Sequence, residues 1–428
     1  MSGVSVIILF LVLLATGLPV AYVMYATAGV YFLSVGLNVS VMIQKMGSSM
    51  NSITMVAIPM FIFAGTLMNN VNLTDSLFKS ILVTPIGRMK GGLAQVNVVA
   101  SLVFAGMSGA ALADGGGLGK IEIKAMTTAG YSMEDATGIT LASSAIGPIF
   151  PPSVPLMLYA LYAEQSGITM LMAGVVPALI LTIAMMAIVG FRARKLDWPT
   201  YHEEGGFQHL LKVFLKGIPA FCVPLILLGG MYSGSFAPSE LASLAAVCAV
   251  IVGGIFYKGV SIKALVNTAK ESVGNIASMM FICGAASLFA QVISRSGIPA
   301  LVQNLVLGLT DNSVILLLAI NVAFLVIGMF MDSNIAIMIF TPILLPALIS
   351  LGVSPVHFGV IVCLNVVIGI FTPPFGSALF LGQAITGVSF QKMVKAMMPY
   401  YVPLIVVLLL VTLVPQLSTW LPNMLYGV

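Results

Sequence analysis

Long apolar segments, separated by glycine, proline and charged residues, dominate the chain. Several reach the length of about 18 residues that is typical of a helix spanning a bilayer. The alternating pattern of a transmembrane β-barrel is absent. The sequence therefore predicts an all-α polytopic membrane protein. Its apolar segments are expected at 3–17, 20–36, 53–70, 92–128, 133–163, 169–191, 217–233, 238–256, 272–292, 313–350, 355–386 and 397–420.

Two of these segments, 92–128 and 313–350, are too long for one span and too short for two spans with a loop. Each has a small or polar centre, at residues 106–110 in the first and 331–334 in the second. A re-entrant helical hairpin, which enters and leaves by the same face, fits that length. Non-helical backbone at membrane depth is tolerated only where it lines a cavity or packs on protein.

Two other segments, 133–163 and 355–386, are long for single spans, and each contains a Pro-Pro pair near its middle. The pairs are Pro151-Pro152 and Pro373-Pro374. Proline lacks a backbone donor and clashes with the preceding helical turn. We therefore expect two broken helices, each with an unwound stretch whose carbonyl groups are available to a ligand.

These features repeat along the chain. A shift of 222 residues aligns 106–152 with 328–374 without a gap, and the identities include Gly106/Gly328, Gly147/Gly369 and Pro152/Pro374. Self-similarity at a fixed offset indicates repeated architecture. The chain is predicted to consist of two related halves, 1–191 and 217–428, joined by a polar cytoplasmic linker at 192–216.

Charge gives the expected orientation. The chain has 17 basic and 13 acidic residues, so 7% of it is charged, against roughly 25% in soluble proteins. This excludes a soluble enzyme, a nucleic-acid binder and a disulfide scaffold. With 192–216 in the cytoplasm, all basic residues except Lys45 and Arg295 fall on the cytoplasmic side. The two hairpins then enter from opposite faces as inverted repeats, and both termini are periplasmic. Inverted repeats with broken helices are typical of secondary transporters.

Asp332 is the most informative single residue, because it lies in the apolar run IGMFMDSNIAIMIF at the second hairpin tip. A carboxylate at membrane depth is costly and usually faces a cavity or a partner. An N-cap of the second hairpin arm is an alternative role, and the two can coexist. Its segment has no basic residue, which favours a bound cation. Ser108 at the first tip is either a ligand or a packing residue, and the role of Asp114 stays open.

Hard monovalent cations need several oxygen ligands, and unwound carbonyls with a hydroxyl or carboxylate supply them. The repeat therefore predicts two pseudo-symmetric Na⁺ sites. Site 1 is formed by Ser108, Gly147, Phe150 and Pro152, and site 2 by Asp332, Gly369, Thr372 and Phe375. The candidate substrate ligands are Ser143, Ser153, Asn334 and Ser377.

Four motifs together are specific: FAGMSGAALAD, ASSAIGPIFPPSVPLMLYA, GMFMDSNIAIMIFTPILLP and NVVIGIFTPPFGSALF. In them the chain resembles the large membrane subunit of tripartite ATP-independent periplasmic (TRAP) transporters, the DctM or SiaM type. The resemblance implies a Na⁺-driven importer of the bacterial inner membrane with an elevator mechanism. It also implies a periplasmic substrate-binding protein and a small four-helix membrane subunit, expected as a separate chain because this one begins at the first span of the large subunit.

Family members carry C4-dicarboxylates, acidic sugars such as sialic acid, and keto acids, so the resemblance implies an organic anion as substrate. A stand-alone symporter or antiporter of related architecture, coupled to Na⁺ or H⁺, is the alternative. A passive channel would need no inverted repeat. An intramembrane enzyme would need a catalytic pair at bilayer depth, which the motifs do not supply.

Overall fold

The computed structural model describes the chain except residues 72, 83, 109–117, 201–206, 311 and 428. The described part is helical, and its only strand-like pairing is a bridge between Lys90 and Thr200. The first half contains α1 (Gly3–Ala15), α2 (Val20–Ser34), α3 (Val39–Met50), α4 (Ile53–Asn70), α5 (Leu73–Leu82), α6 (Gly92–Ser108), α8 (Leu118–Thr128), α9 (Met133–Ser143), the 3₁₀ turn η1 (Ser144–Ile146), α10 (Val154–Tyr162), α11 (Gly167–Ala173) and α12 (Val175–Lys195).

The second half is helical in the same way and ends in a short helix beyond the last long one. It contains α13 (Phe207–Ser233), α14 (Pro238–Ile255), α15 (Ile262–Arg295), α16 (Ile298–Leu309), α17 (Ser313–Phe330), α18 (Ser333–Ser350), α19 (Pro355–Ile370), α20 (Ser377–Thr386), α21 (Phe390–Leu413) and α22 (Gln416–Tyr426).

Seven helices within the described ranges are long and apolar enough to cross a membrane, or eight if α3 and α4 form one bent span. Several helix bounds differ from the expected segments. α3, α5 and α16 were not expected, and α13 begins at Phe207 inside the polar stretch 192–216. The segment 397–420 is divided at Pro415, which has no N–H group to continue the hydrogen bonding of α21.

The helix bounds of the two halves agree at the offset of 222 residues. α6 ends at Ser108 and α17 at Phe330, while α8 ends at Thr128 and α18 at Ser350. α9 and α19 begin at the equivalent residues Met133 and Pro355. The same order of elements therefore occurs twice, and the opposite orientation of the two copies in a membrane stays a prediction.

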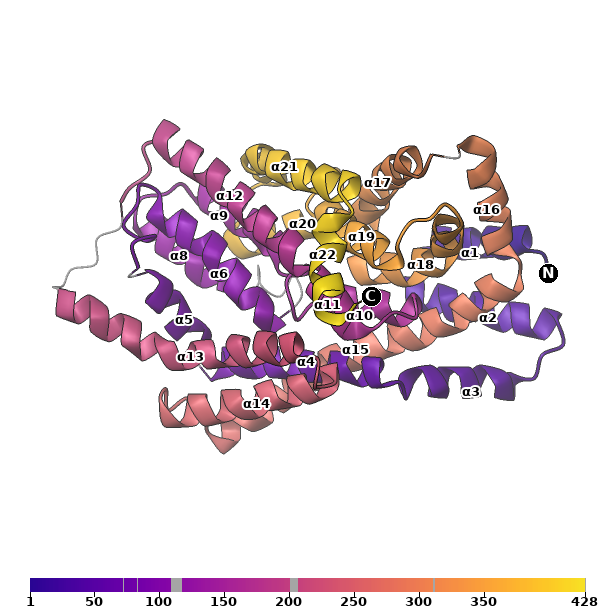
Figure 1. Ribbon diagram of the computed structural model, residues 1–428, viewed down its shortest axis with the longest axis horizontal. Coiled ribbons are helices and arrows are strands. Elements are labelled where there is room, and N and C mark those ends of the chain that lie inside the picture. The colour runs from indigo at the N-terminus through magenta and orange to yellow at the C-terminus, as the bar shows by residue number, and fades with distance from the viewer. Residues whose placement is uncertain (72, 83, 109–117, 201–206, 311, 428) are drawn as a thin grey trace.

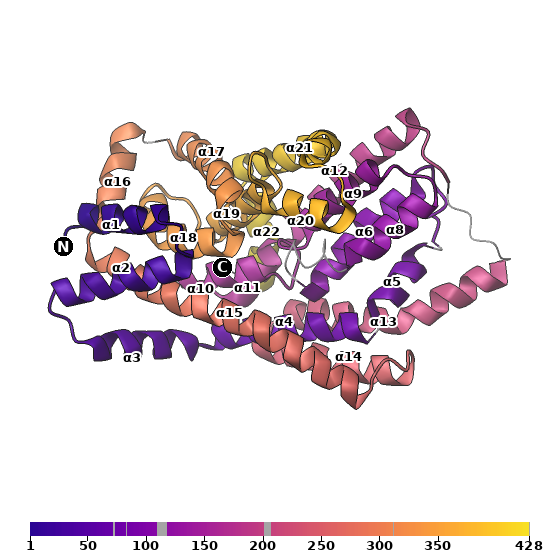
Figure 2. The same ribbon diagram turned by 180° about the vertical axis from the view of Figure 1, so that it is seen from behind.

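The molecule is elongated (Figures 1 and 2). α13 and α14 lie along one long edge, α12 and α21 lie along the opposite edge, and α10, α19, α20 and α22 lie near the centre in both views. α14 packs on α4 and α13 packs on α5. The helices next to the two breaks thus lie in the middle of the fold. The pair α13 and α14 lies on one side of them, and the pair α12 and α21 lies on the other.

Ion pairs tie the ends of three helices together. The Arg192 Nη2 atom, near the end of α12, lies 2.6 Å from Asp135 Oδ1 in the first turn of α9. The Arg192 guanidinium also lies 5.4 Å from the ring centroid of Tyr400 in α21, a cation–π contact. Lys392 of α21 pairs with Glu134 of α9 at 3.1 Å. All of these charged groups come from regions that the charge pattern assigns to the cytoplasmic side.

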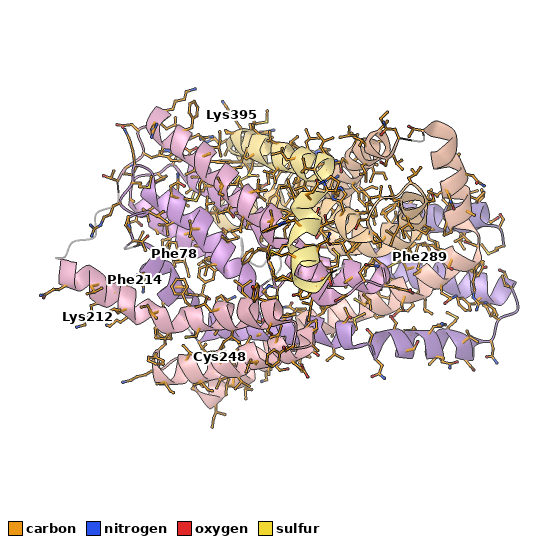
Figure 3. All side chains as sticks on the ribbon, viewed as in Figure 1. Phe78, Lys212, Phe214, Cys248, Phe289 and Lys395 are labelled. Atoms are coloured by element: carbon orange, nitrogen blue, oxygen red, sulfur yellow. The ribbon has the colours of Figure 1, made fainter. Side chains whose placement is uncertain are left out.

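The linker beyond α12 joins the same end of the fold. Asp197 pairs with Lys90, and that hydrogen bond and charge lower the pKa of the Asp197 carboxyl. Figure 3 shows Lys395 and Lys212 in the same half of the molecule, whereas Phe289 lies in the other half. Both lysines belong to regions that the charge pattern assigns to the cytoplasmic side, and the orientation itself stays a prediction.

Candidate functional site

The first break separates α9 from α10 at residues 147–153, where η1 ends and the chain turns through Pro151-Pro152. Phe150 N–H donates to the Ile146 carbonyl at 3.1 Å, which closes the last turn. Within the described ranges, no hydrogen bond reaches the carbonyl groups of Gly147, Phe150 or Pro152. These are three of the predicted site 1 ligands. A buried carbonyl without a donor is costly, so a cation there would be stabilised.

Two contacts hold the first break in place. Ser153 caps α10 by accepting from the Leu156 N–H at 3.1 Å, and its hydroxyl donates to the Pro148 carbonyl. The junction between α11 and α12 packs against the break through Gly174. A Cβ added at Gly174 would lie 2.1 Å from the Ile149 carbonyl oxygen, so only glycine permits this approach.

The second break separates α19 from α20 at residues 371–376. Thr372 N–H donates to the Gly369 carbonyl at 2.9 Å, and the Thr372 hydroxyl donates to the Ile368 carbonyl at 2.9 Å. The Tyr401 hydroxyl of α21 donates to the Phe371 carbonyl at 2.7 Å. Within the described ranges, the carbonyl of Phe375 accepts no hydrogen bond. This break is thus tied to α21, and it retains an oxygen that a ligand could use.

The end of α17 lies against the second break. A Cβ added at Gly369 would lie 2.6 Å from Gly328 Cα, so the backbones of α17 and α19 touch at two glycines. The Phe330 and Phe375 rings contact each other in a tilted arrangement, with a centroid distance of 4.8 Å and an interplanar angle of 41°. Asp332 follows Phe330 by two residues, so the predicted hairpin tip is adjacent to the break.

Asp332 is the N-cap of α18. Its Oδ1 atom accepts from the Asn334 N–H at 2.9 Å, and its side chain is exposed. The alternative role of Asp332, as the N-cap of α18, is therefore observed in the structure. It leaves the cation role open, because a carboxylate has more lone pairs than one cap uses. Ser108 is the last residue of α6, but its side chain and all of Asp114 lie outside what the structure describes.

Ser143, a predicted substrate ligand, is fully buried in a polar network between α6 and α9. Its hydroxyl donates to Asn97 Oδ1 at 2.7 Å and lies 2.9 Å from the Ser101 hydroxyl. The Asn97 amide donates to Glu122 of α8 and to Thr140, both at 2.8 Å. The network joins both arms of the first predicted hairpin to α9. Its polar groups supply Ser143 with partners without any substrate.

The second half contains a matching tie. Asn365, the repeat partner of Ser143, donates from its amide to Asn321 Oδ1 at 2.9 Å, which joins α19 to α17. Asn321 in turn donates to the Thr412 hydroxyl of α21 at 2.8 Å. These residues were not among those predicted from the sequence. Their signal was present, since amides and hydroxyls in apolar segments recur next to the repeated breaks.

The three remaining predicted substrate ligands lie in different surroundings. Ser153 is buried, and its hydroxyl already accepts from the Leu156 N–H and donates to the Pro148 carbonyl. Ser377 is the exposed first residue of α20, beside the second break. The side-chain oxygen of Asn334 is buried and has no hydrogen-bond partner within the described ranges. Asn334 and Ser377 are therefore the two that retain capacity for a ligand.

The two broken helices also contact each other. The Tyr159 hydroxyl of α10 donates to the Pro355 carbonyl at the start of α19, at 2.7 Å. A Cβ added at Gly359 would lie 2.3 Å from the Tyr159 ring. The halves thus meet through helices that flank the two breaks, and the oxygens at these breaks can serve cations or a polar substrate.

A family model described as "Tripartite ATP-independent periplasmic transporter, DctM component" matches residues 7–417. The chain belongs to this family. Proteins of the family are large permeases of the inner membrane that work with a periplasmic binding protein and a small membrane subunit. The predicted family and the all-α polytopic fold are thereby confirmed.

Relatives agree with this membership, and a solved structure shares the fold. The sialic acid TRAP transporter large permease SiaM of Vibrio cholerae is 34% identical over 421 residues, covering 97% of each chain. The C4-dicarboxylate permease DctM of Pseudomonas aeruginosa is 33% identical, covering 87% of each. The 2,3-diketo-L-gulonate permease YiaN of Escherichia coli is 30% identical, covering 94% of this chain and 95% of its own. The YdaH transporter of Alcanivorax borkumensis shares the fold, with a TM-score of 0.64 at 14% identity and 89% and 87% coverage.

Proposed function

We propose that this TRAP permease imports an organic anion across the inner membrane, driven by Na⁺. A periplasmic substrate-binding protein delivers the anion, and a small four-helix membrane subunit completes the transporter. The relatives are named for sialic acid, C4-dicarboxylates and 2,3-diketo-L-gulonate. All three are carboxylates, which supports an acidic sugar, a C4-dicarboxylate or a keto acid as the substrate.

The observation that supports the proposed Na⁺ coupling is the pair of unwound helix breaks. Each presents carbonyl oxygens that accept no hydrogen bond within the described ranges, at Phe150 in the first and at Phe375 in the second. The second lies beside the helix end that leads to Asp332. Carbonyl dipoles together with one carboxylate suit a monovalent cation. Site 1 comprises Ser108, Gly147, Phe150 and Pro152, and site 2 comprises Asp332, Gly369, Thr372 and Phe375.

The buried polar ties support an elevator mechanism. The Asn97 network joins α6, α8 and α9, and the Asn321 network joins α17, α19 and α21. Breaking such ties inside a bilayer is unfavourable, because water is absent there. The hairpins and broken helices therefore move as one block, while the paired helices α4 and α14 belong to the scaffold.

Asp332→Asn tests the ion site. Asparagine keeps the size and the capping ability of the residue but removes the charge. In the reconstituted complex we expect the half-saturating Na⁺ concentration for uptake to rise at least tenfold, which corresponds to about 1.4 kcal/mol. Thermal stability should change little, because the cap of α18 survives.

Asp197→Asn is the matched control, since it makes the same chemical change in the linker and should leave uptake unaltered. If Asp332→Asn leaves both the half-saturating Na⁺ concentration and the maximal rate unchanged, Asp332 serves only as a helix cap. Uptake without the binding protein would instead favour a stand-alone symporter.

A further inference from the structure

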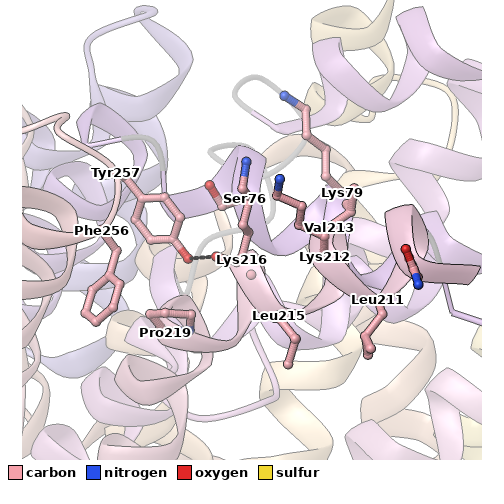
Figure 4. Close-up of a pocket in the computed structure, with 12 residues that line it drawn as sticks. Ser76, Lys79, Leu211, Lys212, Val213, Leu215, Lys216, Pro219, Phe256 and Tyr257 are labelled. Carbon is pink, nitrogen blue, oxygen red and sulfur yellow. Dashed lines mark hydrogen bonds between the residues drawn. The ribbon is translucent and has the colours of Figure 1, made fainter. Parts of the chain in front are cut away.

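A cavity of about 890 Å³ lies where α5, the first turns of α13 and the chain just after α14 meet (Figure 4). Gly217 brings α13 close to α5, because a Cβ there would lie 2.2 Å from Ser80 Cβ. On the other side, the Tyr257 hydroxyl donates to the Lys216 carbonyl at 2.7 Å. Close packing and a hydrogen bond thus define the walls of the cavity, which is remote in sequence from both helix breaks.

Three lysines line this cavity: Lys79 of α5, and Lys212 and Lys216 of α13. Lys212 and Lys216 are four residues apart, so they share one helix face. None of the three forms an ion pair with a carboxylate in the described ranges. Figure 4 shows their ammonium groups gathered at the same end of the cavity. Three neighbouring ammonium groups that have no carboxylate partner among the described residues repel one another, and an anion would relieve that repulsion.

The opposite end of the cavity is apolar. The side chains of Leu211, Leu215 and Pro219 extend away from the ammonium groups in Figure 4, and Phe256 lies at the same end. Leu211, Leu215 and Phe256 are 43%, 51% and 59% exposed. A small soluble anion would contact the lysines but not this apolar wall. A ligand with an anionic head and hydrocarbon chains would satisfy both ends.

The charge pattern assigns Lys79, Lys212 and Lys216 to the cytoplasmic side of the membrane. Anionic lipids attract basic residues at this surface, and basic pockets between membrane helices bind their head groups. We propose that the cavity binds an anionic phospholipid. The phosphate lies among the three ammonium groups, and the acyl chains lie along Leu211, Leu215 and Phe256.

The test is lipid binding by the purified full-length chain in a neutral detergent, measured by native mass spectrometry. The probes are dioctanoyl phosphatidylglycerol, dioctanoyl phosphatidylcholine and inorganic phosphate. The variant Lys79→Gln/Lys212→Gln/Lys216→Gln removes the ammonium groups from the cavity. The control Lys258→Gln/Lys263→Gln/Lys270→Gln removes the same net charge from the same predicted side but leaves the cavity lining intact. All six substitutions are at exposed positions, so both variants should fold.

We expect wild type and control to bind phosphatidylglycerol at least tenfold more tightly than the cavity variant does, and more tightly than they bind phosphatidylcholine. Leu215→Asn should weaken phosphatidylglycerol binding without changing phosphate binding. If the cavity variant and the control variant lose the same amount of phosphatidylglycerol affinity, the lipid is attracted by the overall positive charge and not by this cavity, and the proposal is wrong. If inorganic phosphate displaces phosphatidylglycerol at equal concentration, the cavity is a site for free anions and the lipid proposal is wrong. Displacement of the lipid by the small membrane subunit would identify a protein contact surface instead.

Discussion

At the residue scale, glycines mark the places where backbones meet. The repeat pairs Gly106 with Gly328 and Gly147 with Gly369. In the second half, Gly328 and Gly369 touch, which explains why both positions lack a side chain. The sequence alone predicted the breaks from the Pro-Pro pairs, but it could not predict this contact, because it joins residues of two different helices.

Gly369→Ala should push the end of α19 away from α17. The added Cβ would lie 2.6 Å from backbone atoms that no side-chain rotation can move. We expect a loss of about 1–3 kcal/mol in stability, together with weaker Na⁺ dependence of uptake. Thermal unfolding in detergent and Na⁺ titration of uptake measure the two effects. Gly274→Ala in α15, where nothing lies near the added Cβ, is the control and should lower neither the stability nor the Na⁺ dependence of uptake.

Ser143→Ala distinguishes a structural hydroxyl from a substrate ligand. Removing the hydroxyl leaves Asn97 and Ser101 each without one hydrogen-bond partner. We expect a loss of about 1 kcal/mol in stability, seen as a lower Tm, and an unchanged KM for substrate. The exposed Ser243→Ala, whose hydroxyl bonds only within α14, should not lower the Tm. A raised KM at wild-type stability would instead support the substrate role.

At the element scale, apolar length and proline position predicted most of the long helices and both breaks. α3 and α5 were missed because short helices with many polar residues do not form long apolar runs. α16 is mostly apolar, but with 12 residues it is shorter than a membrane span. α15 begins at Ile262, earlier than the apolar run that starts at 272, because Ser261 caps it by accepting from the Ala264 N–H at 3.1 Å. A capping residue fixes where a helix begins, whereas hydropathy indicates only which part of the helix is apolar enough to lie in lipid.

Length does not decide whether α17 and α18 form a re-entrant hairpin or two spans. Each has 18 residues, close to the minimum for a span. Single cysteines at Lys90, Lys124, Thr310 and Leu351 can decide it, in a background without the four native cysteines. Membrane-impermeant maleimide should label the first two from the cytoplasmic side only and the last two from the periplasmic side only. Labelling of Thr310 and Leu351 from opposite sides would show that α17 and α18 do not form a hairpin.

At the scale of the whole molecule, two related halves meet through their broken helices. Contacts between α10 and α19, including the Tyr159 hydrogen bond to Pro355, place both breaks near the centre of the fold. The family and the fold class followed from sequence motifs and hydropathy. The substrate did not, because relatives that are similarly identical to this chain, at 30–34%, are named for different acids.

The most direct test of the central claim is uptake of a labelled organic acid by the reconstituted transporter. Proteoliposomes would contain this chain with its small membrane subunit, with the membrane potential clamped and the binding protein supplied outside. We predict uptake under an inward Na⁺ gradient. Little uptake should remain when K⁺ replaces Na⁺ or when the binding protein is omitted. Equal uptake in K⁺ would contradict Na⁺ coupling, and equal uptake without the binding protein would contradict delivery by that protein.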